Sequence, residues 1–201
     1  MKGNENERLI MFSDAVIAIT ITLLVLDIRL PTSASELTES QLWSELLALG
    51  PRYLSYVVSF VVIGIFWMGH RQKFETITRS SPGLIWLNLL FLLGVGIMPF
   101  VTDILAESNG SLSTMLYAAL VAVISLVSAL MAAYARWTGL IDKSAQAPGL
   151  WRAVWPSLAP AVVFAVSIPI AYLDSSLGKY FWLTLIPLNI AIHRLAPAKP
   201  D

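Results

Sequence analysis

Six stretches of about 20 mostly apolar residues follow one another along the chain, and they limit its fold more than any other feature. A helix needs roughly 20 apolar residues to cross a hydrocarbon core about 30 Å thick. The stretches cover residues 9–30, 53–68, 84–105, 112–134, 153–173 and 177–195. We therefore expect an all-α, polytopic membrane protein in which residues 1–201 form a single domain of six transmembrane helices.

The composition agrees with this fold class and excludes several functions. Hydrophobic residues make up 57% of the chain and charged residues 13%, whereas a soluble domain carries about 25% charged residues. The formal net charge is zero, so we expect no nucleic-acid partner. The chain has no cysteine and two histidines, which excludes disulfides, thiol catalysis and Cys/His metal clusters. We expect no cofactor and no metal.

The connecting segments predict the orientation in the membrane. Residues 31–45 are rich in Ser, Thr and Glu and are expected to form a loop, and shorter polar turns are expected at residues 80–83, 108–111 and 174–176. Lys and Arg accumulate in short cytoplasmic connections. Ten of the 13 basic residues fall on the side of the two termini, namely Lys2, Arg8, Arg71, Lys73, Arg79, Arg136, Lys143, Arg152, Arg194 and Lys199. Both termini should therefore be cytoplasmic.

The first apolar stretch contains an acid, Asp14. A charge inside a membrane helix costs about 2.5 to 3.5 kcal/mol on insertion scales, so the carboxylate needs a partner or water. The nearest candidates are Arg8 and residues 67–71 at the end of the second span. A cleaved signal peptide would not need this acid, so we expect the first span to remain in the protein. We interpret Asp14 as part of a polar contact that braces helix ends.

The same stretch has a second pattern on another face of its helix. At about 100° per residue, Ile19, Leu23 and Leu26 fall within about 60° of one another, and Thr22 flanks this stripe. Asp14 lies on the opposite side. Periodicity alone favours packing of this stripe against another helix over a pore, and Thr22 is compatible with a bond to a carbonyl one turn earlier.

The residues themselves add a resemblance. Residues 8–14 read Arg-Leu-Ile-Met-Phe-Ser-Asp, and residues 18–24 read Ala-Ile-Thr-Ile-Thr-Leu-Leu. This run resembles the first-helix signature of the transmembrane protein 175 family of potassium channels, which has Arg-x-x-x-Phe-Ser-Asp followed by Ala-x-x-x-Thr-Leu-Leu. The resemblance extends to Trp67-x-x-His70 at the end of the second span and to the six spans overall.

The resemblance implies a pore that is lined by the first helices of several chains, four in single-repeat members of prokaryotic type, and hence a homotetramer in a cell membrane. By position, Ile19 would form the tightest constriction, Leu23 and Leu26 would continue the narrow path outward, and Thr22 would help to select potassium ions. The bracing network and the remainder of the signature would comprise Arg8, Phe12, Ser13, Asp14, Trp67 and His70.

General physics is compatible with these roles. A ring of isoleucines narrows a pore and gates it by dewetting, and threonine hydroxyls offer oxygen dipoles without fixed charge. The chain has no Thr-Val-Gly-Tyr-Gly segment, which forms the carbonyl filter of ordinary potassium channels. It also has no helix with a basic residue at every third position, so we expect no voltage sensor.

Other polar residues lead to expectations that a structure can test. His70 is expected to be held by a hydrogen bond to Asp14 or Trp67, and Asn88 to bond between helices. Gly94 is expected to allow two helices to approach closely. A cation-attracting vestibule or a plain solvated loop would be formed by Asp27, Arg29, Glu36, Glu39 and Glu45.

Two functions of different classes follow. The first is a passive potassium channel that is gated at Ile19. The alternative is a proton-coupled secondary transporter that uses Asp14 and His70, although the sequence shows no paired repeats of the kind that such transporters use. We do not expect the protein to be an enzyme. The spans contain no nucleophile–base pair or metal cluster, and the short connections leave little room for a catalytic domain.

Overall fold

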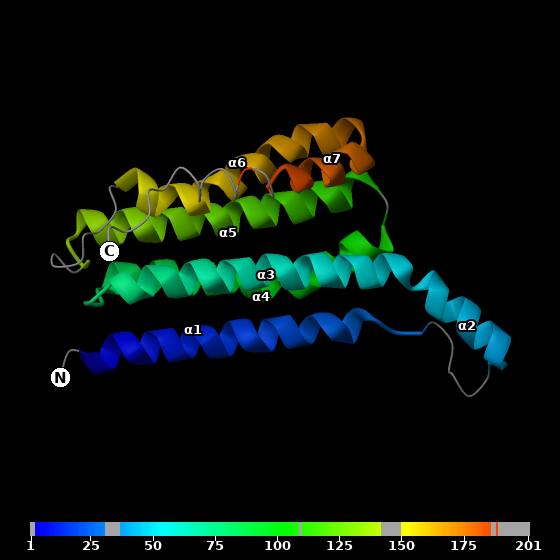
Figure 1. Cartoon of the computed structure of the whole chain (residues 1–201), viewed down its shortest axis with the longest axis horizontal. Coiled ribbons are helices and arrows are strands. Elements are labelled where there is room, and N and C mark those ends of the chain that lie inside the picture. The colour runs from blue at the N-terminus through cyan, green and yellow to red at the C-terminus, as the bar shows by residue number, and fades with distance from the viewer. Residues whose placement is uncertain (1–2, 31–36, 109, 142–149, 186–187, 189–201) are drawn as a thin grey trace, which may run out of the picture.

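The structure is a computed structural model, and it describes residues 3–30, 37–108, 110–141, 150–185 and 188. Long helices lie nearly side by side (Figure 1). The elements are α1 (Gly3–Leu23), which continues as the 3-10 turn η1 (Leu24–Asp27), α2 (Glu39–Ala48), α3 (Gly50–Thr76), α4 (Pro82–Glu107), α5 (Ser111–Trp137), α6 (Leu150–Leu173), α7 (Ser175–Phe181) and the 3-10 turn η3 (Trp182–Thr184). The described residues form no strand, only an isolated antiparallel bridge between Ile77 and Ile141. The prediction of an all-α fold is confirmed.

Five of the described helices are long and apolar enough to cross a membrane. They correspond to the first five predicted spans, although the first ends at Asp27 and not at Leu30. The sixth predicted span, residues 177–195, falls partly on α7 and η3, and residues 186–187 and 189–201 lie outside the described residues. The count of six therefore stays a prediction.

The expectation that residues 31–45 form a loop was wrong for its second half, because α2 begins at Glu39. Thr38 and Gln41 form a capping box at its start: the Thr38 side chain accepts from the Gln41 backbone N–H, and the Gln41 side chain accepts from the Thr38 backbone N–H. This reciprocal pair satisfies two N–H groups that a helix otherwise leaves open. The composition of the segment concealed this local signal. Residues 31–36 lie outside the described residues.

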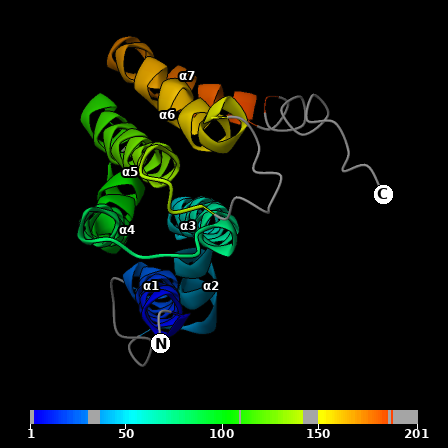
Figure 2. The same cartoon turned by 90° about the vertical axis from the view of Figure 1, so that its left-hand side faces the viewer.

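The helices form two groups, with α1, α3 and α4 in one and α5, α6 and α7 in the other (Figure 2). The groups meet mainly where α4 packs on α5. At this contact a Cβ on Gly94 would lie 2.7 Å from Cγ1 of Ile124, so glycine leaves the space that the Ile124 side chain of α5 occupies against α4. The expectation for Gly94 is confirmed. Within its group, α1 packs on α3 and α4 and lies at the edge of the molecule.

The basic residues separate along the long axis as the sequence predicts. The start of α1, the end of α3, the start of α4 and the end of α5 share one end of the bundle (Figure 1). This end carries Arg71, Lys73 and Arg136, and the connection between α3 and α4 is fixed there by a hydrogen bond from the Thr78 N–H to the Leu140 carbonyl. Arg29 and Arg52 lie at the opposite end. Which end faces the cytoplasm stays a prediction.

Candidate pore helix and its bracing contacts

Helix α1 and the η1 turn have two contrasting faces. We call the first the packed face; it consists of Ser13, Ile17, Thr20 and Leu24, all buried. These residues follow one another at intervals of four, three and four, which is the spacing of one helix face. We call the second the free face; it consists of Ile19, Thr22, Leu23 and Leu26, all exposed on the single chain. Ile17 is 1% exposed and Ile19 is 59% exposed, although they lie two residues apart.

The free face contains all four residues that the resemblance assigns to a pore. Its apolar side chains are 43–59% exposed on the single chain, and the Thr22 hydroxyl donates to the Ile19 carbonyl at 2.7 Å. This back-bond was expected from the sequence. Because the hydroxyl proton is engaged by the backbone, the lone pairs of the Thr22 oxygen remain available on the exposed side. Phe12 is also exposed, nearer the start of the helix.

The packed face is held by a chain of hydrogen bonds that runs through three helices. Nε2 of His70 on α3 lies 2.8 Å from Oδ1 of Asn88 on α4. Nδ2 of Asn88 donates to Oγ of Ser13 on α1 at 2.9 Å, and this hydroxyl donates to the Leu9 carbonyl at 2.8 Å. Since Asn88 Oδ1 is an acceptor, Nε2 of His70 carries the proton. The Ser13 hydroxyl also lies 3.3 Å from Oδ1 of Asn88, so Asn88 is the centre of the chain.

His70 is positioned by aromatic rings as well as by Asn88. Its ring stacks on Phe74 at 4.5 Å and on Phe91 at 5.4 Å between centroids, and the side chain is buried. The expectation that His70 bonds to Asp14 or Trp67 was wrong, since Asn88 is its partner. Helix α4 inserts Asn88 between α1 and α3, and a sequence pattern within one helix does not reveal such a neighbour. The expectation that Asn88 bonds between helices is confirmed.

Asp14 uses a separate contact. Its Oδ1 accepts a hydrogen bond of 2.8 Å from Nε1 of Trp67 on α3, as the sequence predicted for residues 67–71. The guanidinium of Arg71 lies 5.9 Å from the centre of the same indole ring. Arg8, the other expected partner, is exposed and makes no hydrogen bond or ion pair with the described residues. Asp14 and Trp67 line a hollow of about 260 Å³ together with Ile17, Ala18 and Ile21.

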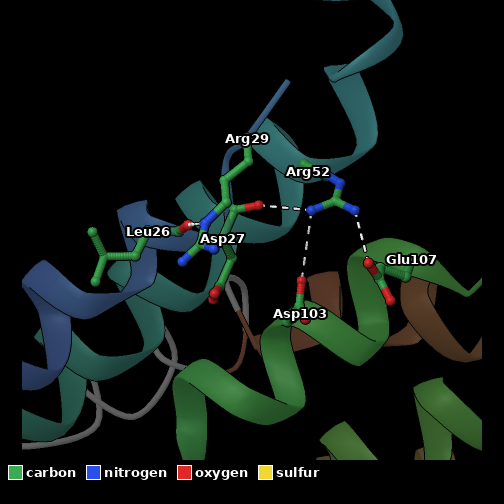
Figure 3. Close-up of polar contacts among 6 residues, drawn as sticks. All are labelled: Leu26, Asp27, Arg29, Arg52, Asp103 and Glu107. Atoms are coloured by element: carbon green, nitrogen blue, oxygen red, sulfur yellow. Dashed lines mark hydrogen bonds and ion pairs between the residues drawn. The ribbon is translucent and has the colours of Figure 1, made fainter. Parts of the chain in front are cut away.

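The opposite end of α1 borders a larger pocket of about 570 Å³. Of the residues expected in a vestibule, Asp27, Arg29 and Glu45 line it, Glu39 does not, and Glu36 lies outside the described residues. The sequence did not indicate that Arg52 of α3 would join them with Asp103 and Glu107 of α4 (Figure 3). The spacing of Asp103 and Glu107, one helical turn apart, was the available signal. Among the described residues, no group of three His, Cys, Asp or Glu side chains is arranged to hold a metal ion.

Comparisons with known proteins show similarity mainly in the half of the chain that contains α1. The sequence profile of the TMEM175 family, described as endosomal/lysosomal potassium channel TMEM175, matches residues 8–99, which cover α1 from Arg8 onward, α2, α3 and most of α4. A potassium channel of Streptomyces collinus is 47% identical over 104 residues, which are 52% of this chain and 49% of the relative. The human endosomal/lysosomal proton channel TMEM175 is 38% identical over 98 residues, 46% of this chain and 19% of the relative.

The chain thus spans about half the length of the bacterial relatives in these sequence matches. A comparison of structures extends over nearly the whole chain. The crystal structure of a lysosomal potassium-selective channel TMEM175 homolog from Chamaesiphon minutus superposes with a TM-score of 0.79 at 26% identity, and the match covers 97% of this chain and 100% of that chain. Signature, arrangement of helices and similarity agree: residues 8–99 match the TMEM175 family, and nearly the whole chain has the fold of a TMEM175 homolog.

Proposed function

We propose that the protein is a passive, potassium-selective channel of the cell membrane whose pore is lined by α1. The observation that carries this proposal is the free face, where Ile19, Thr22, Leu23 and Leu26 point away from their own chain. The packed face meanwhile fixes the same helix to α3 and α4. The bacterial relatives, which are named potassium channels, support the choice of ion.

One helix at the edge of a protomer does not enclose a path, so the proposed pore needs several copies of the chain. A closed ring places the same surface of every copy around one axis. The number of four copies follows from the resemblance to single-repeat family members. The proposal also places both termini in the cytoplasm, as the distribution of basic residues predicts.

The proposed gate is the ring of Ile19 side chains. Walls that offer no hydrogen bonds expel water from a narrow constriction and thereby stop ions. Leu23 and Leu26 continue the narrow path outward. Between these apolar rings, Thr22 supplies oxygen atoms whose lone pairs are not used by the backbone bond to Ile19. Such neutral oxygens bind a cation weakly enough to release it again.

A proton-coupled transporter that uses Asp14 and His70 is the alternative. In the described residues these two side chains belong to different hydrogen bonds, Asp14 to that of Trp67 and His70 to that of Asn88. This arrangement favours bracing over a shared proton path. The animal relatives are named proton channels, so protons are a second ion to measure.

Flux from liposomes that contain the purified protein tests the proposal. Uncoupled potassium flux that exceeds sodium flux is expected, and Ile19→Asn should increase the leak of both ions because a polar side chain hydrates the constriction. Val123→Asn, which places the same amide on the exposed apolar surface of α5, is the matched control and should leave the flux unchanged.

Three results would contradict the proposal. The first is equal flux from Ile19→Asn and the wild type. The second is an equal increase from Val123→Asn. The third is a saturable flux with a fixed proton stoichiometry that disappears in Asp14→Asn, which would favour the transporter.

A further inference from the structure

We infer that Arg52 is a positioning residue that fixes the outer end of the proposed pore helix, the end farther from the predicted cytoplasmic side; this inference rests on the proposed function. The α-helical part of α1 stops at Leu23, and η1 tightens the chain over the next four residues before it becomes extended at Ile28. A helix end leaves carbonyl groups without backbone partners. At this end, arginine side chains bind two of them.

The two arginines come from different parts of the chain. Nε of Arg29 donates to the Leu26 carbonyl at 2.6 Å, so this contact is local. Nη1 of Arg52 donates to the Asp27 carbonyl at 2.7 Å, across 25 residues of sequence and from the first turn of α3 (Figure 3). Cationic donors at a helix C-terminus satisfy its carbonyls and interact favourably with the helix dipole.

Arg52 is itself held by α4. Its Nη2 lies 2.8 Å from Oε1 of Glu107, and its Nη1 lies 3.7 Å from Oδ1 of Asp103. The side chain is 29% exposed. One planar guanidinium therefore connects the end of η1 to α3 and α4. Because its fork of N–H donors is rigid, it forms both contacts with little further loss of side-chain entropy.

The contact matters for the pore because Asp27 follows Leu26 in a tight turn. A displacement of the Asp27 carbonyl rotates the turn and changes the direction of Leu26, the last residue of the free face. Arg52 thus sets the width of the outer path without lying in it. The gate at Ile19 and the Thr22 oxygens lie in the α-helical part of α1 and keep their own contacts.

Arg52 has a simpler possible role, an ion pair that only joins α3 to α4. The two roles make different predictions for the acids. The variant Asp103→Asn/Glu107→Gln removes both negative charges but keeps oxygen acceptors for the guanidinium, so Arg52 can still bind the Asp27 carbonyl. Arg52→Gln removes the fork, and Arg52→Lys keeps the charge on a single compact ammonium that lacks the fork.

The chain has no cysteine, so spin labels can be placed without a background. Val25→Cys, exposed in the η1 turn, reports on the outer end, and Met11→Cys, exposed near the start of α1, is the reference. In full-length protein that elutes as the wild type on size exclusion, we expect Arg52→Gln to narrow the spectral lines of the label at position 25 and not at position 11. Arg52→Lys should narrow them less, and Asp103→Asn/Glu107→Gln least.

Single-channel recordings give the second readout. Arg52→Gln should lower the potassium conductance, because Leu26 side chains that have lost their fixed direction enter the ion path, and should leave the potassium-to-sodium permeability ratio unchanged.

The inference is overturned by an unchanged spectrum at position 25 in both Arg52 variants. It is also overturned if the acid variant frees this position as much as Arg52→Gln does, or if the conductance stays constant. Wild-type protein without flux would contradict the proposed function, whereas the spectra would still test whether Arg52 fixes the end of η1.

Discussion

The two faces of α1 are made of similar residues but have opposite surroundings. The packed face and the free face each combine aliphatic side chains with a small hydroxyl, and each contains a threonine that donates to a carbonyl one turn earlier, Thr20 to Val16 and Thr22 to Ile19. Only the packed face has Ser13 and the Asn88 chain of hydrogen bonds. The difference teaches that composition does not assign a role to a membrane helix face; its neighbours do. Matched substitutions on the two faces therefore separate packing from conduction.

The largest expected effect comes from the two isoleucines. Ile17→Ala should lower the free energy of unfolding by about 2–4 kcal/mol, because it leaves a cavity in a close-packed site. Ile19→Ala should change the stability of the protomer much less, since Ile19 is exposed on the single chain, and should increase potassium leak. Reversible unfolding in detergent and liposome flux measure the two quantities. Equal loss of stability in both variants would mean that the two faces do not differ.

The next effect concerns the centre of the hydrogen-bond chain. Asn88→Leu leaves Nε2 of His70 and Oγ of Ser13 without their partner, and it should lower the unfolding free energy by about 1–3 kcal/mol, the cost of an unsatisfied buried polar group. His70→Phe with Asn88→Leu removes both partners of that bond, so the double variant should be more stable than additive losses predict. Strict additivity in this double-mutant cycle would show that the two residues act independently.

A smaller effect is expected at Asp14. Trp67→Phe removes the indole donor and leaves the carboxylate unpaired, which should cost about 1–2 kcal/mol of stability. Asp14→Asn retains an acceptor for Trp67, so its effect should be smaller, and potassium flux should persist. Thermal unfolding and flux of the two variants are compared directly. Loss of all flux in Asp14→Asn with a native melting profile would contradict a purely bracing role.

The smallest expected effect separates the two threonines. Thr22→Val keeps the shape but removes the hydroxyl, so it should weaken the preference for potassium over sodium by about 0.5–1.5 kcal/mol, or roughly two- to tenfold, the net value of one hydrogen-bonding group. Thr20→Val removes a buried hydroxyl on the packed face and should leave the preference unchanged. Reversal potentials under a potassium–sodium gradient measure both. A shift of the reversal potential with Thr20→Val alone would place the ion path on the packed face and contradict the proposal.

Several features could be predicted from the sequence because they depend on local or additive properties. The long apolar runs predicted the first five spans, and the alternating direction of successive spans predicted which connections share one end of the bundle. Helical periodicity placed Ile19, Leu23 and Leu26 on one face, opposite Asp14. The residues around position 67 were correctly identified as a partner of Asp14.

Only the tertiary structure decided which helices meet and in which register. It paired His70 with Asn88 instead of Asp14, gave residues 39–48 a helix, and brought Arg52 to the end of η1. These contacts join residues that are far apart in sequence, and their geometry depends on the rotation and translation of whole helices. Helical periodicity repeats within a helix and so identifies its faces, but it contains no information on what each face contacts, and that choice separates the packed face from the free face.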